Sequence, residues 1–140
     1  MQIRDIMTDP CIFAEEDTPI ERIAFLMKEH NIGSVPICDK NGMVKGIITD
    51  RDIVTRQVAE GRDPKCLTAS DVMTTQVETV EPSWDVSEAS RIMASRQIRR
   101  LPVVEDNRVV GLVALGDMAA TPTYDMEIAK ALSEISEEDR

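Results

Sequence analysis

One segment places a hydroxyl and a carboxylate where they could hold a phosphorylated ligand. In the stretch from Gly46 to Asp52, Thr49 and Asp52 stand at a predicted strand-to-helix turn. The backbone amides of a helix N-terminus suit an anion, and both oxygens of a carboxylate can accept hydrogen bonds from a ribose diol. The same two residues could instead serve only as a helix cap and a first-turn acid. This segment alone leaves both interpretations open.

A pair of arginines offers a second group that could bind an anion. Arg99 and Arg100 stand at the entry to a predicted strand, beside Arg96. Arginine binds phosphate through a planar fork of N–H donors. Alternatively, the pair is solvated and only balances an acidic surface.

Metal and catalytic chemistry find little support. His30 is the only histidine, and Cys11, Cys38 and Cys66 are far apart with no CxxC spacing. We therefore predict no metal site, and three reduced thiols in a cytoplasmic protein. GxSxG, P-loop and GxGxxG motifs are all absent from the sequence, so we predict a protein that is not an enzyme.

Charge and composition argue against several partners. The formal net charge is −10 and aromatic residues make up 3% of the chain. Duplex nucleic acid and anionic membranes would be repelled, and few aromatic rings are available to stack on bases. No run of 18 apolar residues and no signal-peptide core is present,. We therefore predict no nucleic-acid partner and no membrane partner.

The chain repeats itself with a shift of about 66 residues. Four blocks return in the same order, the last after a one-residue deletion: Asp5–Thr8 as Asp71–Thr74; Ile20, Ile23, Leu26 and Met27 as Val86, Ala89, Ile92 and Met93; Ile32–Ile37 as Ile98–Val103; and Gly46–Ile53 as Gly111–Met118. Such self-similarity indicates two copies of one unit. The predicted division is repeat one with the start of a linker at 1–62, repeat two at 63–122, and an acidic C-terminal helix or tail at 123–140.

Each repeat is predicted to have the order β-α-β-β-α. A short extended piece, at 11–14 or 77–80, precedes a helix that carries an apolar stripe. Capping boxes are predicted at Thr18–Glu21, with Pro19 as the first helical residue, and at Asp85–Glu88,. Two strands follow, at 34–39 and 44–48 or at 101–105 and 109–113.

Hairpin turns are predicted between those strands, at Asn41-Gly42 and at Asp106-Asn107,. A second helix begins near Asp50 or near Gly116. The fold class is therefore α/β, and we expect the two repeats to pack sheet to sheet with pseudo-twofold symmetry. In the tail, Met126, Ile128, Ala129, Leu132 and Ile135 have helical spacing, which suggests a terminal helix or a contact with a partner.

The blocks Ile6–Thr8, Gly33–Ile37 and Gly46–Ile53, each returning in the second copy, resemble a tandem pair of CBS domains, also called a Bateman module. The resemblance covers residues 1–122 and extends to small stand-alone bacterial CBS proteins of the hypoxic-response type. It implies a regulatory module that binds adenosine compounds in clefts between two repeats, without catalysis. The implied ligands are AMP, ADP and ATP, with NAD or S-adenosylmethionine also possible.

The resemblance also assigns roles to residues of this sequence. Asp52, Asp117 and Thr49 are expected to bind the ribose. Arg99 and Arg100 are expected to bind the phosphate, and Ala14 and Val80 to line the base pocket. Because Ala114 stands where the first copy has Thr49, we expect the site with Asp52 to bind more tightly than the site with Asp117. The resemblance further implies a homodimer, and the protein target is unknown. The alternative is a protein-interaction or structural module with degenerate nucleotide clefts.

Overall fold

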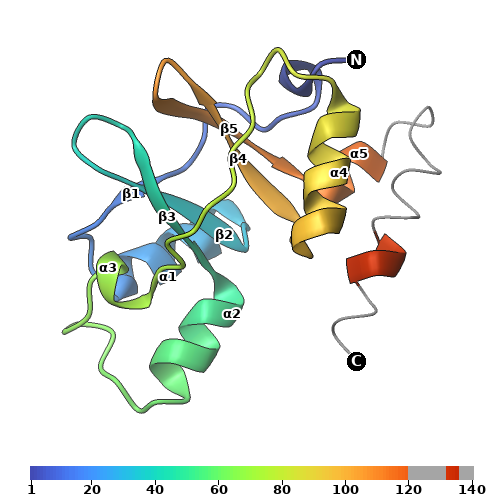
Figure 1. The fold of residues 1–140 in the computed structure, drawn as a ribbon. Helices are drawn as coiled ribbons and strands as arrows, with labels where there is room; N and C mark the ends of the chain where they lie inside the picture. The colour runs from blue at the N-terminus through green and yellow to red at the C-terminus, as the bar shows by residue number, and fades with distance from the viewer. Residues whose placement is uncertain (120–131, 136–140) are drawn as a thin grey trace. The chain divides into compact units, whose positions relative to one another are not determined.

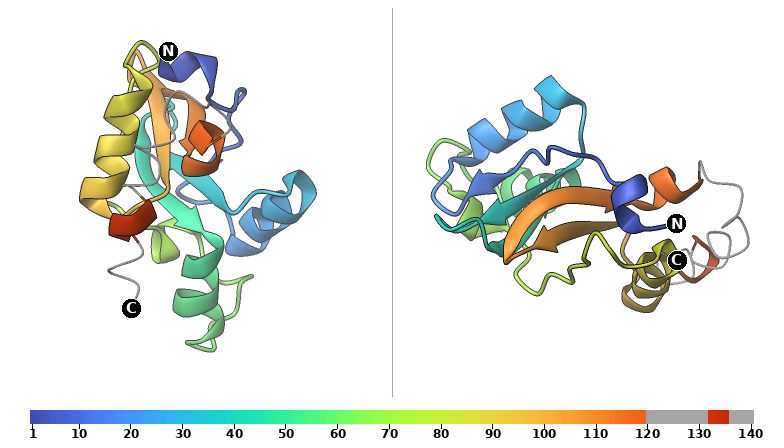
Figure 2. Two further views of the ribbon diagram at one scale, coloured as in Figure 1. Left: turned by 90° about the vertical axis from the view of Figure 1, so that its right-hand side faces the viewer. Right: turned by 90° about the horizontal axis from the view of Figure 1, so that it is seen from above.

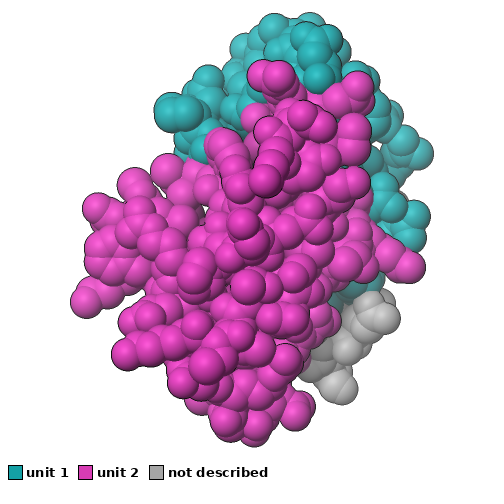
Figure 3. Space-filling view, turned by 90° about the vertical axis from the view of Figure 1, so that its left-hand side faces the viewer, with its two compact units in different colours: residues 1–11, 78–106, 110–140 teal, residues 12–77, 107–109 magenta. Residues whose placement is uncertain are grey.

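The structure is a computed structural model that describes residues 1–119 and 132–135 (Figure 1). The chain forms two compact units, shown in different colours in Figure 3. Unit 1 consists of residues 1–11, 78–106 and 110–140, and unit 2 consists of residues 12–77 and 107–109. Each unit has its own hydrophobic core.

Unit 2 holds a three-stranded sheet in the order β1-β2-β3. Its elements are β1 (Ala14–Glu15), α1 (Ile20–His30), β2 (Ser34–Cys38), β3 (Val44–Thr49), α2 (Asp50–Ile53) with a π-helical continuation (Val54–Val58), and α3 (Ala69–Val72). β1 and β2 are parallel because α1 carries the chain back between them, whereas β2 and β3 are antiparallel neighbours,. All five residues of β2 are buried, as expected of the central strand.

Unit 1 repeats this arrangement. Its elements are a 3-10 turn (Ile3–Asp5), α4 (Val86–Arg96), β4 (Arg100–Glu105), β5 (Arg108–Ala114), of which the first two residues are assigned to unit 2, and α5 (Leu115–Ala119). The first strand of the repeat is reduced to one bridge, in which Val80 pairs in parallel with Val103, as Ala14 pairs with Ile37 in unit 2. The β-α-β-β-α order predicted from the sequence is thus present in both copies.

The apolar stripes of the two long helices face the cores. Ile20, Ile23 and Met27 of α1 are buried in the core of unit 2. In α4, Ala89 and Met93 are fully buried in the core of unit 1. This spacing of three and four residues is the one that gathers side chains on one face of a helix.

The predicted hairpin turns are confirmed by backbone angles. Asp106 and Asn107 have φ angles of 53° and 64°, and they form a two-residue connection between β4 and β5. Positive φ at both central residues is the requirement of the turn that matches strand twist. Gly42 has φ 84° in the corresponding turn of unit 2.

The capping box predicted at Thr18–Glu21 is wrong. Pro19 is the N-cap of α1 and makes no side-chain cap, while the Thr18 hydroxyl accepts a hydrogen bond from the Glu15 amide at 3.0 Å. The Ile20 amide donates to the Leu67 carbonyl at 2.9 Å and the Glu21 amide to the Pro64 carbonyl at 3.3 Å. Since the unpaired amides at a helix start need acceptors from somewhere, the distant carbonyls make a local side-chain cap unnecessary.

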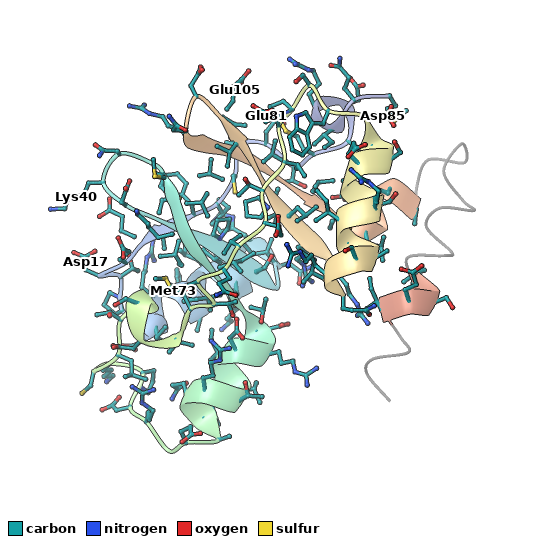
Figure 4. All side chains as sticks on the ribbon, in the orientation of Figure 1. Asp17, Lys40, Met73, Glu81, Asp85 and Glu105 are labelled. Atoms are coloured by element: carbon teal, nitrogen blue, oxygen red, sulfur yellow. The ribbon has the colours of Figure 1, made fainter. Side chains whose placement is uncertain are left out.

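The second predicted box is half formed. Asp85, labelled at the start of α4 in Figure 4, accepts from the Ser87 amide at 3.0 Å and is a true N-cap. Glu88 pairs instead with Arg91. The first helical amide, of Val86, donates to the Met1 carbonyl at 3.1 Å, which is the counterpart of the bond from Ile20 to Leu67.

Each unit is built mainly from one sequence copy and is completed by a short segment from the other copy. The segment Met7-Thr8 packs on Gly111 of β5, and Met73-Thr74 packs on Gly46 of β3. Antiparallel bridges join Thr8 to Leu112 and Ile47 to Thr74. Figures 1 and 2 show the N-terminal turn beside the start of α4.

This exchange shifts the compact units relative to the sequence repeat. The predicted division at 1–62 and 63–122 follows the repeat, whereas the units change between residues 11 and 12 and between residues 77 and 78, with 107–109 assigned to unit 2. Of the predicted tail, 132–135 is helical; Met126, Ile128 and Ala129 lie outside the described residues.

Candidate ligand-binding site

Thr49 and Asp52 form a reciprocal cap at the start of α2. The Thr49 hydroxyl accepts from the Asp52 amide at 3.1 Å, and Oδ2 of Asp52 accepts from the Thr49 amide at 3.0 Å. The structural role suggested by the sequence is therefore present. Oδ1 of Asp52 can still accept a hydrogen bond, because the nearby Nε of Arg56 lies 3.9 Å from it, which is longer than a hydrogen bond. The Asp52 side chain is 16% exposed.

Asp117 holds the corresponding turn of unit 1 with one bond fewer. Its Oδ2 accepts from the Ala114 amide at 3.0 Å. Ala114 has no hydroxyl to bind the Asp117 amide in return. The two turns are thus alike in the carboxylate and differ in the hydroxyl, as the sequence predicts.

Arg99 and Arg100 line a pocket of about 380 Å³ within unit 1. The turn at Ala114, Leu115 and Gly116 forms another side of this pocket. The Leu115 amide donates to the Arg99 carbonyl at 2.8 Å, which ties the turn to the entry of β4. The structure therefore brings the predicted phosphate-binding pair next to the turn that leads into Asp117.

Ala14 and Val80 occupy equivalent core positions. Ala14 is 7% exposed and Val80 is 1% exposed, and their side chains pack in the cores of unit 2 and unit 1, respectively. A ligand at either position would therefore meet mainly the strand backbone. Asp52, Thr49 and Ala14 belong to unit 2, whereas Asp117, Val80 and the arginine pair belong to unit 1.

Both sequence repeats match a known protein family. The profile of the CBS domain matches residues 3–59 and 69–121. The chain belongs to the CBS domain family. The CBS domain-containing protein YhcV of Bacillus subtilis is 40% identical over 134 residues, which span 96% of this chain and 94% of YhcV. Hypoxic response protein 1 of Mycobacterium tuberculosis is 35% identical over 116 residues, which span 83% of this chain and 81% of that protein.

Solved structures agree with this assignment. The structure of hypoxic response protein I with two coordinated zinc ions has a TM-score of 0.80 and 34% identity, and the match covers 86% of this chain and 98% of that one. The CBS domain pair of protein MJ0100, in complex with 5′-methylthioadenosine and S-adenosylmethionine, has a TM-score of 0.78 and 32% identity over 86% of this chain and 94% of that one. The predicted tandem CBS pair is confirmed.

The position of two residues at these sites was not predicted from the sequence. Arg56 follows Asp52 by one helical turn, and its Nη1 donates to the Val72 carbonyl at 3.0 Å. The spacing of four residues between an acid and a base was a usable signal. Leu132 lines the pocket of unit 1, and no local pattern connects it with Arg99 or Arg100.

The three cysteines of this CBS pair differ in burial. Cys38 is buried, Cys66 is exposed, and burial raises the pKa of the Cys11 thiol to about 11. Within residues 1–119 and 132–135, no three His, Cys, Asp or Glu side chains gather as metal ligands would. In the same part of the chain, no helix is long and apolar enough to cross a membrane.

Proposed function

We propose that this CBS pair binds an adenosine nucleotide as a regulatory ligand and catalyses no reaction. The observation that carries the proposal is the pocket of unit 1, which combines two arginines with the turn before Asp117. The MJ0100 pair, in complex with two adenosine compounds, supports this ligand class. AMP, ADP, ATP, NAD and S-adenosylmethionine are the candidates, in a cytoplasmic protein.

The proposed roles follow the chemistry of each group. Arg99 and Arg100 bind phosphate, and Asp52 and Asp117 accept hydrogen bonds from ribose hydroxyls. Thr49 adds a hydroxyl at the turn of unit 2. Ala14 and Val80 flank the base, which their strand backbones would contact.

Calorimetric titration with AMP and with adenosine tests this proposal. A charge-assisted hydrogen bond contributes about 1.5–3 kcal/mol, so AMP should bind at least roughly tenfold more tightly than adenosine. Arg100→Ala should remove most of this difference. Arg91→Ala is the matched control, because Arg91 lies on α4 and pairs with Glu88. Equal affinities of the wild-type protein for AMP and adenosine would contradict the role of the arginines.

Separate Asp52→Ala and Asp117→Ala variants test the order of the two sites. The hydroxyl of Thr49 favours the site with Asp52 by about 0.5–1.5 kcal/mol, the value of one neutral hydrogen bond. The arginine pocket lies in the unit of Asp117, and it offsets this advantage for phosphorylated ligands. The test therefore uses adenosine, which has no phosphate for the arginines. Loss of the tighter binding phase in Asp52→Ala alone is the predicted result, and its loss in Asp117→Ala alone would reverse the order.

A second candidate function is protein interaction, including a homodimer. Val54 and Val58 follow α2 one helical turn apart and are 58% and 60% exposed. We take these two side chains as part of the surface of the proposed contact. Sedimentation of the wild-type protein should show a dimer, and Val58→Asp should shift it toward the monomer. If no adenosine compound binds at millimolar concentration, this function replaces nucleotide binding.

We propose no zinc site from the likeness to hypoxic response protein I. Its structure contains two coordinated zinc ions, whereas residues 1–119 and 132–135 of this chain gather no set of three metal-binding side chains.

A further inference from the structure

A short helical segment near the C-terminus reaches the arginine pocket. Residues Leu132–Ile135 are helical, and Figure 1 draws them in red near the end of α4. They lie beyond both stretches that match the CBS domain, the second of which ends at residue 121. The pocket is nevertheless lined by Leu132 together with Arg99 and Arg100.

The hydrophobic core holds this segment in place. Ile135 is 3% exposed and belongs to the same buried cluster as Met93 and Met118. Residues three apart in a helix lie on the same side, so the burial of Ile135 positions Leu132 at the pocket. Leu132 itself is 44% exposed, which leaves apolar surface that a ligand could cover.

The composition of the pocket points to a ligand with two different ends. Arg99 and Arg100 supply positive charge, whereas Leu115, Ala119 and Leu132 supply apolar surface. Inorganic phosphate would use only the arginines. A phosphate ester with a flat, weakly polar ring would also cover the leucine side chains, and burial of apolar surface favours that arrangement.

We propose that Leu132 forms a wall of the nucleotide pocket and that ligand binding and docking of the C-terminal segment stabilise each other. This inference rests on the proposed binding of adenosine nucleotides. It adds that the base, rather than the phosphate, contacts Leu132. Ligand binding and docking of the segment are coupled equilibria, and such coupling acts equally in both directions. A docked segment therefore raises the affinity for the ligand, and a bound ligand holds the segment in its docked position.

The direct test is titration of the full chain with AMP and with adenosine. Leu132→Ala should weaken binding of both ligands by the same factor, roughly three- to tenfold. Arg100→Ala should weaken AMP and leave adenosine almost unchanged. Ser133→Ala is the matched control, since Ser133 is the exposed neighbour in the same turn and does not line the pocket. Its affinities should equal those of the wild-type protein.

Hydrogen exchange measures the reciprocal effect. Saturating AMP should slow amide exchange in the peptide that contains Leu132–Ile135, and Leu132→Ala should reduce this protection at equal occupancy. If the wild-type protein binds AMP while Leu132→Ala binds it equally well, the wall is excluded and the proposed function stands. If the wild-type protein binds neither AMP nor adenosine, both the proposed function and this inference are overturned.

Discussion

Gly46 and Gly111 are the residues at which the two exchanged segments pack most closely. A Cβ on Gly46 would lie 2.6 Å from Sδ of Met73 and 2.8 Å from the Thr74 carbonyl oxygen. A Cβ on Gly111 would lie 2.8 Å from Sδ of Met7. The repeated glycine and the repeated Met-Thr pair are therefore two halves of one contact, and this explains why both recur in the sequence.

Gly46→Ala should lower the free energy of unfolding by about 1–3 kcal/mol, because overpacking of a buried contact has this cost. Denaturant unfolding of the variant measures the change. Gly116→Ala is the control: it lies in α5 with nothing within 4 Å of its added Cβ, and a helical alanine should stabilise by about 0.5–1 kcal/mol. Equal stability of Gly46→Ala and the wild-type protein would show that Met73 can move away.

The three thiols should differ in their rates of alkylation. The thiolate is the reactive form, and burial raises the pKa of Cys11 to about 11 while Cys66 is exposed. Iodoacetamide at about pH 8 should modify Cys66 first, and Cys11 and buried Cys38 only slowly. Mass spectrometry of the digested protein assigns the sites. Faster modification of Cys11 than of Cys66 would contradict the burial of Cys11.

The short helices depend on caps more than on length. α3 has four residues, and Thr68 and Asp71 form a reciprocal capping box at its start. The hydrogen bond from the Thr68 amide holds the pKa of the Asp71 carboxyl below its usual value of 3.8. A helix this short has little stability of its own, so the cap and the burial of Ala69 and Val72 maintain it.

The stabilisation from Asp71 should depend on pH. A carboxyl whose pKa is lowered in the folded state stabilises above its unfolded pKa, and this contribution disappears as the pH falls through the folded value. Asp71→Asn should therefore reduce the unfolding free energy near pH 7 and match the wild-type protein at about pH 2. Urea unfolding at several pH values tests this. Glu60→Gln, at an exposed position, controls for the general loss of one negative charge.

The whole molecule is built by exchange between the sequence copies. Ile3 is fully buried in the core of unit 1, whose other buried residues come from the second repeat and, in the case of Ile135, from the tail. Val72, from the corresponding segment after the first repeat, is fully buried in the core of unit 2. A mutation in either segment should therefore act on the unit that contains it and not on the repeat that follows it.

Ile3→Ala should accelerate hydrogen exchange in α4, β4 and β5 more than in α1, β2 and β3. Val72→Ala is the reciprocal variant and should produce the opposite pattern. Removal of a buried aliphatic side chain costs about 2–5 kcal/mol, which is large enough to separate the two regions by mass spectrometry. Acceleration by Ile3→Ala mainly in residues 20–49 would show that the N-terminal segment does not belong to unit 1.

Local patterns were sufficient for the parts of the fold that neighbouring residues decide. Hydrophobic spacing and turn residues located the long helices, the paired strands and the turn at Asp106-Asn107, because each depends on contacts only a few residues apart. Repetition of Thr49 and Asp52 as Ala114 and Asp117 likewise predicted two related but unequal turns.

Contacts between distant segments could not be derived in this way. The first amides of α1 donate to the carbonyls of Leu67 and Pro64. Thr18 therefore does not cap this helix, although the local spacing predicted that it would. Leu132 reaches the arginine pocket because Ile135 is buried in a core formed by other segments. The sequence by itself determined the repeat, its elements and their candidate chemistry. The tertiary structure decided which copy completes each core, because burial of apolar surface lowers the free energy of the folded state wherever along the chain the apolar segment lies.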